Sequence, residues 1–246
     1  MKYFLETSDT IPKGVGFSHF SPLHLGWIAA FLLTAILCSR VYRKSDEKHR
    51  ERIRHVFAML IIADELFKMA GLFIGGNYEP AYLPFHLCSI NIFIIAIQAF
   101  HPSKLLDNFL YAICIPAAIA AILFPTWTKL PLLNFMHLHS FSIHILLAVY
   151  PIMLTVGKDI CPQPKQLPRC VALLLTMAIP VYGINLLFDT NFMFLMRADT
   201  GNPLKVFEQI FGSHLVGYLI LIPIVFAFMY TLYWLLTRKS CRLASI

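Results

Sequence analysis

Hydrophobic residues fall into seven long runs separated by short polar segments. A helix needs about 20 mostly apolar residues to cross a bilayer, and each run meets or approaches that length. The runs cover residues 24–41, 53–75, 84–100, 105–124, 134–156, 169–188 and 214–237. Helices satisfy their own backbone hydrogen bonds in lipid, so the pattern predicts an all-α, polytopic membrane bundle of about seven transmembrane helices.

Composition supports this prediction. The chain has 246 residues, of which 58% are hydrophobic and 13% are charged, whereas soluble domains usually carry about 25% charged residues. The length suits one domain. We therefore expect residues 1–246 to form a single integral membrane domain, a multi-pass protein of the cell membrane (the cytoplasmic membrane in a bacterium).

Basic residues predict the orientation. The loop after the first run holds Arg40, Arg43, Lys44, Lys48, Arg50, Arg52 and Arg54, and the same side by parity holds Lys104, Lys158, Lys165, Arg169, Arg238, Lys239 and Arg242. By the positive-inside rule that side is cytoplasmic. We expect the N-terminus outside and the C-terminus in the cytoplasm. Because the charges lie in loops and form no folded basic patch, nucleic-acid binding is not predicted.

Polar side chains gather at one depth, on the expected outer side. This group contains His19, His24, His86, His137, His139, His144, His214, Asn134, Asn185, Asp189 and Asn191. Polar residues inside a membrane are costly, and they are usually functional or paired. The gathering predicts a site just below the outer surface.

The third run opens with His86 and Cys88, which suggest a nucleophile and a base. Residues two apart in a regular helix point about 200° apart. We therefore expect the base for Cys88 to come from another helix. The alternative is that Cys88 is a small packing residue.

The fifth run contains three histidines. His137 and His144 are seven positions apart and share a helix face, which makes them candidates for a general base. His139 points elsewhere, and with His24 it is assigned to substrate binding. The alternative is that neighbouring helices satisfy these rings and that their role is structural.

The sixth run places Tyr182, Asn185 and Asp189 on one face of its outer end. Asn185 and Asp189 are candidates for orienting a histidine or stabilising an oxyanion, and Tyr182 and Asn191 for binding substrate. Hydrogen bonds between packed helices are the equal alternative.

The second run buries Asp64, Glu65 and Lys68 at spacings that allow pairing within one helix. A structural ion pair is one interpretation, and the coupling site of a transporter is the other. The His-x-His spacing of the fifth run is poor for chelation, so no metal is predicted. The sequence contains no phosphate-binding loop and no GxSxG motif, and we expect no soluble cofactor.

A long loop over residues 189–213 precedes the last run, and loops of this length are often functional. Apolar residues within 203–211 predict an amphipathic helix. Such a helix either rests on the outer leaflet or caps the bundle, and the pattern leaves both open.

Three short motifs carry a resemblance to a known family. Residues 20–25 (FSPLHL), 83–88 (LPFHLC) and 190–195 (TNFMFL) resemble the YwaF-like integral membrane family. That family is similar to the eukaryotic transmembrane ether-phospholipid acyltransferase group. The resemblance implies acyl transfer near the start of the third helix, with His86 as the firmest match and Cys88 as the thiol of that motif.

Two functions follow as hypotheses. The first is an acyltransferase that moves a fatty acyl chain to or from membrane lipids, with a site open to the outer leaflet and no protein partner. Cys88 or His86 would be the reactive group, and His137 or His144 the base. The second is a transporter or ligand-binding membrane protein that uses Asp64, Glu65, Lys68 and the histidines. An enzyme needs polar groups at one depth, whereas a transporter needs a polar path through the bilayer.

Overall fold

The structure is a computed structural model that describes residues 3–199 and 202–237. In these residues it is entirely helical, with no strand. The helices are α1 (Pro22–Lys44), α2 (Glu47–Ile74), α3 (Leu87–Phe100), α4 (Lys104–Phe109), α5 (Ile115–Leu123), α6 (Phe135–Val156), α7 (Leu167–Phe188), α8 (Leu204–Phe211) and α9 (Leu215–Thr237). Short 3₁₀ turns lie at η1 (Pro80–Tyr82), η3 (Pro164–Gln166) and η4 (Phe192–Phe194).

Six helical segments of the described residues are long and apolar enough to cross a membrane. They are Pro22–Lys44, Pro80–Phe100, Lys104–Leu123, Phe135–Val156, Pro164–Phe188 and Leu215–Leu236. The remaining long helix, α2, has 28 residues but carries Asp64, Glu65 and Lys68 in its apolar half. These charges distinguish it from the other six.

The fourth apolar run is one continuous helical path with a break in its hydrogen-bond pattern. A π-helical turn, η2 (Leu110–Cys114), joins α4 to α5. Pro116 follows this turn, and its missing N–H removes the hydrogen bond that a regular helix would make one turn earlier. A wider turn accommodates that loss.

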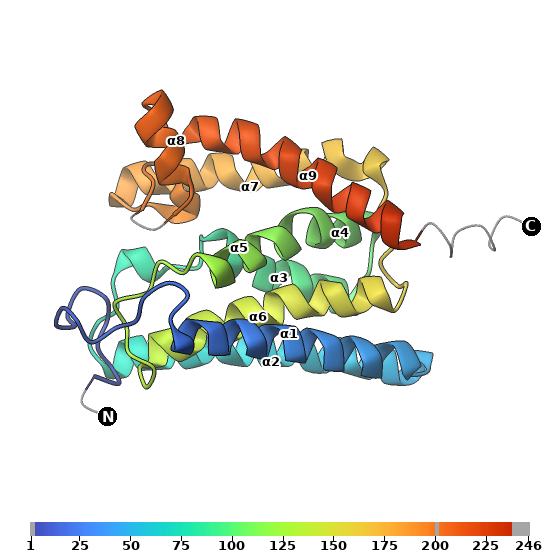
Figure 1. Cartoon of the computed structure of the whole chain (residues 1–246), viewed down its shortest axis with the longest axis horizontal. Coiled ribbons are helices and arrows are strands. Elements are labelled where there is room, and N and C mark those ends of the chain that lie inside the picture. The colour runs from blue at the N-terminus through green and yellow to red at the C-terminus, as the bar shows by residue number, and fades with distance from the viewer. Residues whose placement is uncertain (1–2, 200–201, 238–246) are drawn as a thin grey trace, which may run out of the picture.

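The helices lie in three layers along the bundle (Figure 1). One layer contains α1, α2 and α6, the middle layer contains α3, α4 and α5, and the third contains α7, α8 and α9. Helix α6 packs against α1, α2 and α5. It is the most buried of the six candidate spans and connects the first layer to the middle one.

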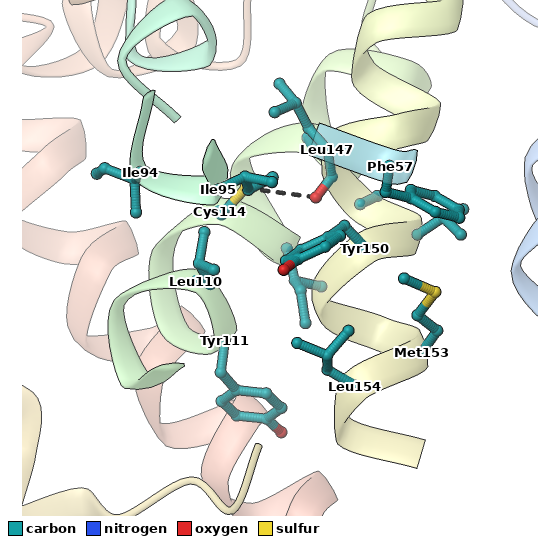
Figure 2. Packing of buried hydrophobic residues seen from close by; sticks show 14 of the residues in the cluster. Phe57, Ile94, Ile95, Leu110, Tyr111, Cys114, Leu147, Tyr150, Met153 and Leu154 are labelled. Atoms are coloured by element: carbon teal, nitrogen blue, oxygen red, sulfur yellow. Dashed lines mark hydrogen bonds between the residues drawn. The ribbon is translucent and has the colours of Figure 1, made fainter. Parts of the chain in front are cut away.

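The middle of the bundle is a close-packed core of buried hydrophobic residues (Figure 2). Ile95, Cys114, Leu147 and Tyr150 are each 1% exposed or less, and the Cys114 thiol donates to the Leu147 carbonyl oxygen at 3.4 Å. This core separates two polar ends. We call them the histidine end, which contains His24, His86, His137, His139 and His144, and the arginine end, which contains Arg50 and Arg54.

Asp159 organises the arginine end. Its carboxylate accepts from Arg50 Nη1 at 2.7 Å, Arg54 Nη1 at 3.2 Å and the Tyr42 hydroxyl at 2.5 Å. These bonds fasten α1 and α2 to the loop after α6. A polar cavity of about 470 Å³ lies beside them, and Gln98 and Asp107 also line it.

The chain before α1 folds over the histidine end. Asn134 Nδ2 donates to the carbonyl oxygens of Tyr3 and Glu6, at 2.8 Å each. The Phe17 amide donates to the Thr128 carbonyl oxygen at 2.8 Å. These bonds hold the segment against the loop that precedes α6.

Candidate functional site

A cavity of about 370 Å³ opens at the histidine end, among α2, α3, α5 and α6. Its polar lining includes Glu65, Lys68, His86, Cys88, Ser89, His139, Ser140 and His144. Most of the remaining wall is apolar, including three alanines of α5. The cavity therefore combines a thiol and imidazoles with a mostly apolar wall.

His86 and Cys88 line the same cavity. The predicted separation of about 200° applies to a regular helix that begins near Pro84. Helix α3 begins at Leu87, and His86 is its N-cap with extended backbone angles (φ −67°, ψ 152°). Helical periodicity therefore does not apply between the two residues.

The loop before α8 fixes the His86 ring. The Met193 amide donates to Nδ1 of His86 at 3.4 Å, and the Phe192 ring meets the imidazole edge to face, with 5.1 Å between centroids. A neutral ring that accepts at Nδ1 carries its proton on Nε2. His86 is thus arranged as a hydrogen-bond donor.

That loop adopts a costly conformation to reach His86. Met193 and Phe194 both have positive φ, 56° and 51°, which is uncommon for residues with a side chain. The Tyr218 hydroxyl anchors the turn by donating to the Met193 carbonyl oxygen at 2.7 Å. Such strain persists where the surrounding structure enforces it, and here one of the two residues, Phe194, lines the cavity.

His144 has the opposite arrangement. Its Nδ1 lies 2.6 Å from the Ser140 carbonyl oxygen, so Nδ1 carries the proton and Nε2 carries the lone pair. No residue of the described chain hydrogen-bonds that Nε2. His144 is therefore arranged as a proton acceptor, the property required of a general base.

Charged groups form a connected set on the α2 side of the cavity. Nδ1 of His139 lies 3.1 Å from Asp64 Oδ2, and its Nε2 lies 3.8 Å from Glu65 Oε2. Glu65 also forms an ion pair with Lys68. The three charges of α2 are thus connected to His139, which lines the cavity.

His137 and His24 lie outside this cavity. His137 is fully buried; its Nδ1 donates to the Leu130 carbonyl oxygen, and its Nε2 accepts from Trp27 Nε1, both at 3.0 Å. His24 accepts from the Phe20 amide at 2.8 Å and donates to the Ile122 carbonyl oxygen at 2.7 Å. In both rings, both nitrogens form hydrogen bonds within the protein. This arrangement matches the alternative that these histidines have a structural role.

The polar residues at the end of α7 also lie outside the cavity. Asn185 is buried, and its side chain accepts from the Phe192 amide at 2.8 Å and donates to the Phe192 carbonyl oxygen at 3.1 Å. These two hydrogen bonds hold the turn that follows α7. Asn191 accepts from the amides of Met196 and Arg197. Asp189 and Tyr182 are exposed. From this region, Phe194, Asn202 and Pro203 line the cavity instead.

The helix predicted at residues 203–211 is observed as α8. It packs against α9, with Leu204 buried, whereas Val206, Ile210 and Phe211 are more than half exposed. Sequence reasoning missed Trp127, which lines the cavity from the loop before α6. A single loop aromatic has no periodicity to mark it.

No group of three or more histidine, cysteine, aspartate or glutamate residues in the described chain is placed to hold a metal ion. The six helices of the described chain that are long and apolar enough to cross a membrane define a multi-pass helical membrane protein. Residues 15–235 match the family model of the TMEM164 family, and the chain belongs to that family of transmembrane proteins. No curated protein and no solved structure matches the chain.

Proposed function

We propose that the protein is an acyltransferase that moves a fatty acyl chain between membrane lipids inside the histidine-end cavity. The observation that carries the proposal is that Cys88, His86 and His144 line one largely apolar cavity. A lipid acyl ester is already reactive toward a thiol, so this chemistry needs no soluble cofactor. A site enclosed in a bundle also keeps water from the intermediate.

Each residue has a role consistent with its hydrogen bonds. Cys88 Sγ attacks the carbonyl carbon of the donor ester while Nε2 of His144 takes the thiol proton. The ester C–O bond then breaks, and the departing alcohol receives that proton. Nε2–H of His86 donates to the oxyanion that forms. The product of this half-reaction is an acyl thioester on Cys88.

The second half-reaction returns the enzyme to its starting state. A hydroxyl of the acceptor lipid attacks the thioester carbonyl carbon, and His144 takes its proton. The C–S bond breaks, and the proton passes to the Cys88 thiolate. Glu65, Lys68 and His139 form the polar side of the cavity, where they would meet the polar part of the lipid.

Mass spectrometry of purified protein mixed with lipid vesicles tests the proposal. We expect an acyl adduct on Cys88 that is absent in Cys88→Ala and strongly reduced in His144→Gln. Cys161→Ala is the matched control, because Cys161 is an exposed thiol in the loop after α6. Acyl transfer at the wild-type rate in Cys88→Ala would reject the nucleophile assigned here.

The structure gives the transporter alternative less support. A transported solute needs a polar path between the two ends, and the buried residues Ile95, Leu147 and Tyr150 lie between the two cavities along α3 and α6. These buried residues therefore separate the polar side chains at the histidine end from the cavity at the arginine end. Uptake of a solute by proteoliposomes, with no acyl transfer, would favour the transporter.

We also propose that α2 is a seventh span. In this topology the protein lies in the cell membrane, its N-terminus is outside the cell, and the arginine end faces the cytoplasm. A helix of 28 residues is about 42 Å long, enough to cross a bilayer. Its charges meet the cavity and α6, which lowers their cost in lipid. Of the C-terminal residues used for the orientation, Arg238, Lys239 and Arg242 lie outside the described residues.

Labelling of Cys161 tests this orientation. Cys161 is exposed, in the loop that follows α6 at the arginine end. A membrane-impermeant maleimide should label it in inside-out vesicles and leave it unlabelled in right-side-out vesicles. The reverse result would invert the proposed topology.

A further inference from the structure

Trp127 and His144 form a stacked pair at the cavity wall. Their ring centroids lie 5.2 Å apart and their planes differ by 12°, and both residues line the cavity. Trp127 comes from the loop before α6 and His144 from α6 itself. The indole therefore covers one face of the imidazole whose Nε2 is unpaired.

The indole holds this position at a cost. Its Nε1 is buried and has no hydrogen-bond partner among the described residues. Burying a donor without a partner is unfavourable, and such groups in native structures call for an explanation. Ring contacts place the indole: the stack on His144 and an edge-to-face contact with Phe141, at 5.2 Å.

A stacked indole acts on the charge of the ring that it covers. The face of an indole attracts a cation within about 6 Å, and the effect is larger where water is excluded. When His144 takes a proton from the Cys88 thiol, its imidazolium forms against this face. The stack and the Nδ1 bond to Ser140 together fix the ring plane and stabilise its charged form.

We propose that Trp127 is a positioning residue for acyl transfer, which stacks on His144 and stabilises the imidazolium that forms there. The catalytic role of Trp127 rests on the acyltransferase function proposed above. The contact between the two rings can be measured without an assay of acyl transfer. Two independent measurements therefore test it.

The first measurement is tryptophan fluorescence, because a protonated imidazole in contact with an indole quenches its emission. Subtracting the emission of Trp127→Phe from that of wild type isolates Trp127. We expect this difference to fall as the pH is lowered from mildly alkaline to acidic, and to lose that dependence in a His144→Gln background. The other titratable groups that line the cavity around His144 are Glu65, Lys68, Tyr82, His86, Cys88 and His139.

Matched backgrounds assign the response to one histidine. The pH dependence should persist in His86→Gln and in His139→Gln. A Trp127 emission that ignores pH in wild type, or that keeps its pH dependence in His144→Gln, would overturn the proposal. This result does not depend on whether the protein transfers acyl chains, so it separates failure of the stack from failure of the proposed function.

The second measurement is the rate of Cys88 acylation and its pH profile. Trp127→Leu should slow acylation about tenfold, the change produced by losing roughly 1.4 kcal/mol of cation–π stabilisation, and should shift the pH profile. Trp127→Phe keeps an aromatic face and should recover most of the rate. Wild-type rate and pH profile in Trp127→Leu would remove Trp127 from the mechanism.

Discussion

Nδ1 of His139 lies 3.1 Å from Asp64 Oδ2 and 3.1 Å from the backbone oxygen of the same residue. The Ser142 hydroxyl donates to the other carboxylate oxygen at 2.8 Å. One acidic residue of α2 thus holds two side chains of α6, at the depth where the cavity lies. The polar wall of the cavity depends on this contact between the helices.

Replacing Asp64 should loosen that wall. Asp64→Ala removes the hydrogen bond from the Ser142 hydroxyl to a charged acceptor, a bond worth about 1.5–3 kcal/mol, and it also removes the carboxylate beside His139. We therefore expect a clear fall in Tm in detergent. Asp64→Asn keeps acceptor atoms and should fall less. Ser142→Ala, which loses only the hydroxyl contact, is the control and should change Tm least. An unchanged Tm in Asp64→Ala would contradict the role described here.

Close approach between α2 and α6 depends on Gly71. A Cβ at this position would lie 2.2 Å from Cδ2 of Phe135, a fully buried ring. Gly71→Ala should therefore separate the helices and cost about 1–3 kcal/mol, as overpacking does. Gly183→Ala in α7 is the matched control, because nothing lies within 4 Å of its added Cβ. Equal thermal stability of the two variants would refute this packing argument.

The sequence predicted the helical class well and the site only in part. Long apolar runs are a direct consequence of lipid as solvent, so the helices could be found without tertiary information. The start of α3 could not, because Pro84 matches a first helical turn and nothing local shows that the helix begins at Leu87. That difference decides whether His86 and Cys88 face one cavity.

The histidines of α6 show a second limit. His137 and His144 share a helix face, but residues seven apart are separated by about 10 Å along the axis. They consequently meet different neighbours, Trp27 of α1 and Trp127 of the preceding loop. His139 meets α2 instead. Which ring enters the cavity depends on how α6 packs against its neighbours, and periodicity does not specify that.

Substitutions at the arginine end should lower the thermal stability of the protein and leave acylation of Cys88 unchanged. Asp159→Asn removes the charge that accepts from Arg50, Arg54 and Tyr42, and a loss of about 1–3 kcal/mol follows from charge-assisted bonds of this kind. Asp46→Asn is the control: Asp46 is exposed and caps α2, and asparagine caps equally well. We expect Tm to fall only in Asp159→Asn, with Cys88 acylation per folded molecule unchanged in both. Loss of acylation in a folded Asp159→Asn would link the two ends.

His137 gives the sharpest separation between a structural and a catalytic histidine. Both of its nitrogens are engaged, with Leu130 and Trp27, and it does not line the cavity. We expect His137→Gln to lower Tm, because a buried hydrogen-bond network loses its geometry at a cost of roughly 1–3 kcal/mol, while folded molecules still acylate Cys88. His144→Gln should do the opposite, with acylation strongly reduced and Tm little changed. The two variants are compared by Tm and by thioester yield per folded molecule. A folded His137→Gln that forms no thioester would return His137 to the role of general base.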